Sequence, residues 1–116
     1  MANTLDETGP PIPNAAFLIL FALAGGDLHG YAMMQEVRKL SDGKVQMGPA
    51  TLYTNVRRLL ELGWIREVAG PKSSDSRRRY YRLTADGNSV LSLELERMET
   101  LVRKSKALRL RPAEGR

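Results

Sequence analysis

The sequence predicts a mainly α-helical fold of the α+β class, a winged helix-turn-helix followed by a C-terminal dimerisation helix. Three observations predict it: three helical segments come first, two short β-type segments follow, and a long helical segment closes the chain. The 116 residues amount to one domain with added extensions. We expect a flexible arm at residues 1–13, the winged helix at 14–84, the dimerisation helix at 85–108 and a flexible tail at 109–116.

The first predicted helix follows prolines 10, 11 and 13, with Asn14 as its N-cap, and ends at Gly25 and Gly26. It is apolar nearly all round and is therefore expected at the centre of the core. The apolar run at residues 15–24 is about half as long as a bilayer span. The residues before it are acidic rather than basic, which argues against a signal peptide. We therefore expect no membrane contact.

The second predicted helix follows a histidine. His29 is expected to cap or pack at its start, and Ser41, Asp42 and Gly43 end it. Met33 and Met34 are interpreted as core-filling side chains. The positions that follow helical spacing are Tyr31, Met34, Val37 or Arg38, and Leu40.

The third predicted helix starts with Pro49, which suits a first helical turn, and ends at Gly63. Its apolar face consists of Leu52, Val56, Leu59 and Leu60. The opposite face carries Ala50, Thr54, Arg57, Arg58 and Glu61, with Thr51, Tyr53 and Asn55 on its flanks. Short polar side chains thus occupy the first turn, and two arginines follow.

Residues 64–70 and 77–84 are predicted to pair as an antiparallel hairpin, because a turn-rich stretch separates them. Tyr81 and Leu83 are expected to point into the core, and Tyr80 lies on the other face of the strand. Arg77 and Arg78 are expected at the open end of the hairpin, where the tyrosines anchor the strand that carries them.

The last predicted helix has Thr84 as its N-cap and Asp86 in its first turn, where an acidic side chain suits the helix dipole. Apolar residues at 91, 95, 98 and 102 repeat at intervals of 4, 3 and 4, which is typical of a helix that packs lengthwise against another. No other segment offers a long partner helix, so a second copy of the chain is expected. The predicted dimer interface consists of Leu91, Leu95, Met98, Leu101 and Val102, and Leu108 widens the apolar stripe.

Positive charge is concentrated in the middle of the chain. Residues 44–82 contain nine basic and three acidic residues, whereas the remainder has a net charge of −1 within a total of +5. This distribution indicates a polyanion as partner. There is no cysteine and one histidine, which argues against disulfides and metal sites and fits a reducing cytoplasm. No nucleophile–base pair or phosphate-binding glycine loop is present, so we expect neither an enzyme nor a cofactor.

In a winged helix the third helix enters the major groove of double-stranded DNA, and the hairpin tip contacts the backbone. Arginine guanidinium groups suit phosphate or guanine, and short side chains let the helix approach base edges. The predicted DNA contacts are Ala50, Thr51, Tyr53, Thr54, Asn55, Arg57 and Arg58 from the third helix, and Lys72, Ser73, Arg77, Arg78 and Arg79 from the hairpin.

Three motifs together resemble the PadR family of bacterial transcriptional regulators: LHGYAM at residues 28–33, GPATLYTNVRRLLELGWI at 48–65 and RRRYYRLTADG at 77–87. The resemblance covers roughly residues 14–105. It implies a homodimeric repressor that binds a palindromic operator, with the last helix as dimer interface. The single short C-terminal helix is similar to the compact subfamily, some members of which bind flat aromatic effectors between the subunits.

Two positions differ from the family pattern. The tryptophan that lines the effector pore in the compact subfamily is missing from the last helix, and the only tryptophan here is Trp64. A small apolar effector would instead contact Phe17, Phe21 and Met98. Thr54 replaces the proline that often follows LY in the family, which alters the first turn of the third helix.

Two other functions remain open from the sequence. A winged helix can serve as a protein-interaction adaptor, but a neutral or acidic third helix and hairpin would suit that function better. An architectural protein would bind DNA without sequence preference. The short polar first turn of the third helix favours base reading over that alternative.

Overall fold

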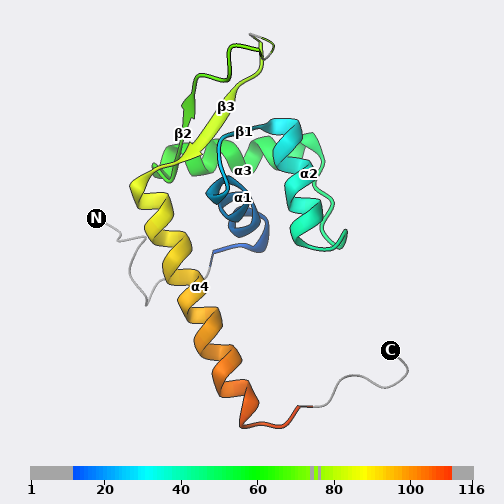
Figure 1. Cartoon of the computed structure of the whole chain (residues 1–116), viewed down its shortest axis with the longest axis vertical. Helices are drawn as coiled ribbons and strands as arrows, with labels where there is room; N and C mark the ends of the chain where they lie inside the picture. The colour runs from blue at the N-terminus through cyan, green and yellow to red at the C-terminus, as the bar shows by residue number, and fades with distance from the viewer. Residues whose placement is uncertain (1–11, 74, 76, 111–116) are drawn as a thin grey trace.

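The computed structural model describes residues 12–73, 75 and 77–110 (Figure 1). Residues 1–11 of the predicted arm (1–13) and residues 111–116 of the predicted tail (109–116) lie outside them. The order of elements confirms the mainly α, α+β fold class, with one additional short strand. The elements are α1 (Asn14–Ala24), β1 (Leu28–His29), α2 (Gly30–Leu40), α3 (Pro49–Leu62), β2 (Ile65–Val68), β3 (Tyr80–Leu83) and α4 (Ala85–Lys106).

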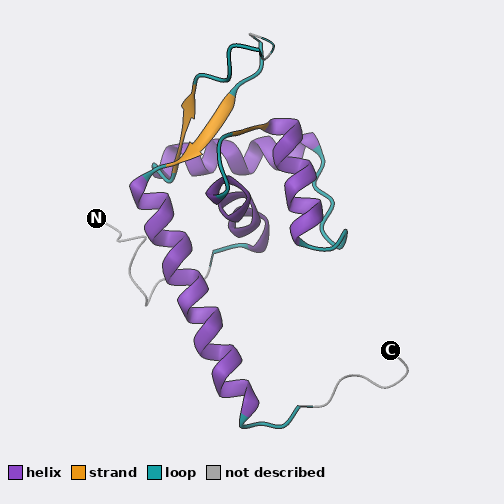
Figure 2. Ribbon diagram, viewed as in Figure 1, coloured by secondary structure: helices purple, strands orange, loops and turns teal. Residues whose placement is uncertain are grey.

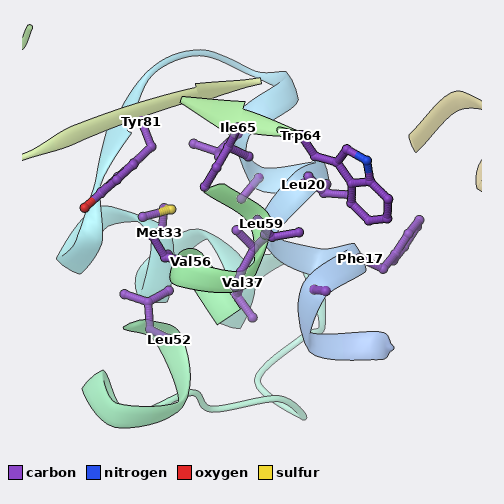
Figure 3. Packing of buried hydrophobic residues seen from close by; sticks show 14 of the residues in the cluster. Phe17, Leu20, Met33, Val37, Leu52, Val56, Leu59, Trp64, Ile65 and Tyr81 are labelled. Atoms are coloured by element: carbon purple, nitrogen blue, oxygen red, sulfur yellow. The ribbon is translucent and has the colours of Figure 1, made fainter. Parts of the chain in front are cut away.

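Helix α1 lies at the centre of the core, as its uniformly apolar sequence predicts. It packs against α2, α3, α4 and β3, and Figure 3 shows Phe17 and Leu20 among the buried side chains of the other elements. The prediction of Asn14 as N-cap is wrong. The backbone N–H of Phe17 donates to the carbonyl of Pro13 at 2.9 Å, so the helix starts one residue earlier, with Pro13 as cap.

Helix α2 begins as predicted but faces the core with a different side. His29 is its N-cap, because the imidazole Nδ1 accepts the backbone N–H of Ala32 at 3.3 Å. The buried positions are Gly30, Met33 and Val37, whereas Tyr31 is 63% exposed. The predicted buried face, which ran through Tyr31 and Met34, was therefore wrong by about one position along the helix.

The sheet has three strands in the order β1-β3-β2, both pairs antiparallel. Strand β1 was not predicted; His29 pairs with Tyr80 and covers it with an edge-to-face contact at 5.2 Å. Tyr80 is consequently as buried as Tyr81, although it lies on the opposite face. Strand β3 starts only at Tyr80, so the predicted strand from residue 77 is too long.

A compact junction joins the sheet to α4. The Thr84 hydroxyl accepts the backbone N–H of Gly87 at 3.0 Å and donates to the Gly63 carbonyl at 2.6 Å. The backbone N–H of Thr84 donates to the Trp64 carbonyl at 3.0 Å. Trp64 is itself buried near Phe17 (Figure 3). The predicted Thr84 cap is thus confirmed, and it also fixes the direction in which α4 leaves the sheet.

Helix α4 packs on the body through its first half alone. Its buried residues are Gly87, Val90, Leu91 and Glu94, all within the first ten positions. The 22-residue helix is about 33 Å long, and its second half extends away from the body, in the direction opposite to the hairpin (Figure 2). Leu91, predicted at the dimer interface, is 4% exposed and belongs to the protomer's own core, so we remove it from that interface.

Candidate nucleic-acid interface

The polar face of α3 is open to solvent. Leu52, Val56 and Leu59 are buried, and the helix therefore turns its predicted contact residues outward. Pro49 in the first turn and Gly63, in a left-handed conformation with φ 77°, set the two ends of this helix. The exposed residues are Ala50, Thr51, Tyr53, Thr54, Arg57 and Arg58, whereas Asn55 is half-buried and donates its amide N–H to the Thr51 carbonyl at 2.9 Å.

The hairpin of β2 and β3, with the loop between these strands, forms the wing of the fold. The predicted arginines of the wing lie in the loop that precedes β3. Two of these arginines are already paired with carboxylates. Arg77 binds Asp75 through two side-chain hydrogen bonds, and Arg79 binds Glu67 at 3.2 Å. The hydrogen bonds from Arg77 hold the pKa of Asp75 below its usual range. The Arg78 side chain forms no hydrogen bond or ion pair with any residue that the structure describes. Arg78 is therefore the wing arginine most available to a new anionic partner.

The wing and α3 form a concave surface, and the concavity between them has a volume of about 620 Å³. It brings together five predicted contact residues, Tyr53 and Arg57 of α3 with Arg77, Arg78 and Arg79 of the wing. His29 and Tyr31 from the start of α2 also line it, and neither was predicted from the sequence to contact DNA. The exposed Lys72 lies instead beside Arg78 in a second concavity of about 410 Å³, and Ser73 is exposed in the adjoining turn.

Arg82 holds the base of the wing rather than facing an external partner. Its guanidinium donates to both carboxylate oxygens of Asp27, at 2.9 and 2.7 Å. This bidentate bond lowers the pKa of Asp27 below its usual value. Asp27 directly precedes β1 and Arg82 lies in β3, so the ion pair joins the chain before the edge strand to the central strand of the sheet.

We expect Asp27→Asn to lower the thermal midpoint modestly at pH 7, since an ion pair open to solvent contributes little. The folded-state pKa of Asp27 lies below the ordinary value of 3.8, so its stabilisation is complete above that pH and is lost as pH falls through the folded pKa. The difference between the wild type and Asp27→Asn, measured by circular dichroism, should therefore shrink below about pH 4. Asp42→Asn, which removes a carboxylate without an ion pair among the described residues, is the control. A difference that does not change with pH would contradict the assignment.

The second half of α4 presents an apolar stripe. Leu95 and Met98 are 37% and 38% exposed, and Leu101 and Val102 are 61% and 57% exposed. Single exposed apolar residues are ordinary, but these four repeat along one side of the helix. Within the described part of the chain, no helix is long and apolar enough to cross a membrane, and no group of metal-binding side chains is placed to hold an ion.

Two proteins of similar sequence match most of the chain. An uncharacterised protein X of Lysinibacillus sphaericus is 33% identical over 75 residues, which cover 65% of this chain and 69% of that protein. An uncharacterised 37.1 kDa protein in transposon TN4556 of Streptomyces fradiae is 33% identical over 88 residues, 76% of this chain but 24% of that protein.

Solved structures resemble this fold closely. A transcriptional regulator from Clostridium thermocellum, 29% identical, superposes with a TM-score of 0.65 over 83% of this chain and 92% of that one. A PadR family regulator from Clostridium difficile, 22% identical, gives 0.71 over 83% and 98%. Bacillus subtilis PadR in complex with operator DNA, 17% identical, gives 0.59 over 90% and 52%. At these lower identities the last two support the fold alone.

The family comparison covers most of the described fold. Residues 19–93, from within α1 to the middle of α4, match the family described as "Transcriptional regulator PadR-like family". The match therefore includes α3, the whole wing and the Thr84–Gly87 junction. This chain belongs to the PadR-like family of transcriptional regulators, which are regulators rather than enzymes.

Proposed function

We propose that this protein is a sequence-specific, DNA-binding transcriptional regulator that acts as a homodimer. The observation that carries the proposal is the shared concave surface, where α3 and the wing place Arg57 and Arg78 on one side of the molecule. Helix α3 would enter the major groove with Ala50, Thr51, Thr54 and Arg58 near the base edges. The wing would follow the phosphate backbone with Lys72, Ser73 and Arg78.

The proposed dimer interface is the apolar stripe of α4, formed by Leu95, Met98, Leu101 and Val102. Its position on the half of α4 that extends away from the body supports this assignment, because a partner helix has free access there (Figure 1). A two-fold dimer would present two copies of α3 about 34 Å apart, one turn of DNA. Such a dimer would bind a palindromic operator, because the symmetry of the site mirrors that of the protein.

We further propose that the protein acts as a repressor, which is what the resemblance of its three motifs to the PadR family implies. The Bacillus subtilis relative was solved with operator DNA, and the shared fold makes the same kind of partner our proposal here. For a small apolar effector, Phe21 and Met98 are the proposed contacts, and Phe17, also predicted from the sequence, lies buried behind them in the core. Phe17 and Phe21 lie edge to face with ring centroids 5.9 Å apart, and Phe21 and Met98 are more than a third exposed.

Two kinds of arginine variant test whether α3 and the wing have different roles in DNA binding. Arg58→Ala should weaken binding to the operator by about 1–3 kcal/mol, as expected for a lost base contact, and Arg57→Ala should also weaken operator binding. Arg78→Ala should weaken binding to all duplexes about equally and reduce the slope of log affinity against log salt by about one. Fluorescence anisotropy over a salt series measures both quantities. Unchanged affinity in all three variants would remove the proposed DNA contacts.

A further inference from the structure

The concave surface between α2, α3 and the wing is lined by hydrogen-bond donors and carries no acidic side chain among its described lining residues. Arg57 and Arg78 supply positive charge that no described carboxylate pairs, whereas Arg77 and Arg79 line the site but are bound to Asp75 and Glu67. The hydroxyl groups of Tyr31 and Tyr53 add neutral donors. Neither hydroxyl forms a hydrogen bond with any described residue, so both are free to donate. A site with these donors and charges suits an anionic group whose oxygens can accept several hydrogen bonds, such as a phosphate.

Tyr53 reaches this surface because α2 starts with a glycine. A Cβ atom on Gly30 would overlap the hydroxyl oxygen of Tyr53 and lie 2.8 Å from its Cζ atom. The missing side chain therefore lets the Tyr53 hydroxyl rest against the first turn of α2. The backbone N–H groups of a helix start and the positive end of its dipole favour an anion at the same place.

His29 adds a neutral donor at the same helix start. Its Nδ1 accepts the backbone N–H of Ala32, so the neutral ring carries its proton on Nε2. Burial, and then the positive charge of Arg78, lower the pKa of His29 and keep the ring neutral near pH 7. No described residue accepts the Nε2 proton. The cap thus fixes the tautomer and leaves one N–H for an external acceptor.

We propose that this concavity binds one backbone phosphate of the DNA in each half-site, with Tyr53 Oη and His29 Nε2 as neutral donors beside Arg57 and Arg78. The inference rests on the proposed DNA-binding function and assigns His29 a contact beyond its role as a cap. The phosphate would fix the angle between the wing and α3 on the duplex, because its ligands come from three different elements.

The test uses two variants that keep the charge of the site. Tyr53→Phe removes only a hydroxyl, and His29→Asn keeps a side chain that caps helices well but loses the Nε2 donor. Each should weaken binding of the full-length protein to the duplex upstream of its own gene by about tenfold, as expected for a hydrogen bond to a charged group. The salt slope should stay unchanged, because no charge has been removed.

A duplex series with one methylphosphonate at a time identifies the phosphate. In the wild type, one neutralised position per half-site should weaken binding about tenfold, and in each variant the same position should matter less, because one of its donors is gone. Tyr80→Phe is the matched control, since Tyr80 does not line the concavity. Thermal melting of all three variants checks that the fold is intact.

The outcomes separate this inference from the proposed function. If Tyr53→Phe and His29→Asn bind as tightly as the wild type while Arg78→Ala binds more weakly, the phosphate site is overturned and the DNA-binding function stands. An equal loss at every methylphosphonate position in the variants and the wild type would also overturn the site. Failure of the wild type to bind any duplex would overturn both proposals.

Discussion

The double variant Leu95→Glu, Met98→Glu is expected to be a monomer of 12.9 kDa. Both side chains lie on the apolar stripe of α4, beyond the last residue of this helix that the protomer itself buries. In the proposed dimer each substitution would bury an unpaired carboxylate, at a cost of several kcal/mol per charge. Sedimentation equilibrium measures the change directly.

The same double variant should lose operator affinity by about a hundredfold or more, because one recognition helix then binds without the effective concentration provided by its partner. Thr100→Glu is the control, since residue 100 lies on the opposite side of α4 from residues 98 and 102. The control should remain dimeric. A double variant that sediments as a dimer would show that the interface lies on another surface.

Gly87→Ala should destabilise the protein by about 3 kcal/mol or more, the upper range for an overpacked core. A Cβ atom at this position would lie 2.8 Å from the carbonyl carbon of Trp64 and closer still to its oxygen. The obstacle is backbone at a junction that Thr84 fixes on both sides, so it cannot move aside as a side chain can. The direction of the effect is diagnostic, because alanine in place of glycine inside a helix ordinarily stabilises it by about 1 kcal/mol.

Gly30→Ala provides the matched comparison for Gly87→Ala. Its Cβ atom would meet the end of the Tyr53 side chain rather than backbone. A change of the Tyr53 χ1 torsion should move the exposed side chain away and relieve the overlap, so this variant should keep most of its stability. Urea denaturation at one fixed protein concentration compares the two, because the stability of a dimer depends on concentration. A free energy of unfolding for Gly87→Ala equal to or above that of the wild type would contradict the packing assigned to the junction.

The sequence predicted the helices and the wing because their signals are local. The 3.6-residue spacing of Leu52, Val56 and Leu59 defines the buried face of α3, and the Thr84 cap acts within one helical turn. The same spacing failed for α2, where the short run through Tyr31 and Leu40 fits two phases. Whether Tyr31 or Met33 faces the core depends on how α2 packs against α1 and α3, which a single-helix pattern does not contain.

The remaining features depend on contacts that are remote in sequence. Strand β1 has two residues, too few to show alternation, and exists through its pairing with β3. The ion pair of Asp27 with Arg82 joins residues 55 positions apart. The approach of Tyr53 to Gly30, and hence the proposed phosphate site, likewise follows from the packing of α3 against α2. Such contacts leave no periodic signal in the sequence.

A competition between two duplexes tests whether this protein binds DNA in a sequence-specific way. Anisotropy should be recorded over a salt series with DNA from the region upstream of the protein's own gene and with a scrambled duplex of equal length. We expect a preference of about a thousandfold or more for the native fragment, with a steep decrease in affinity as salt rises. Equal salt-sensitive binding to both duplexes would contradict sequence reading and indicate an architectural role, and no binding at low salt would contradict DNA binding altogether.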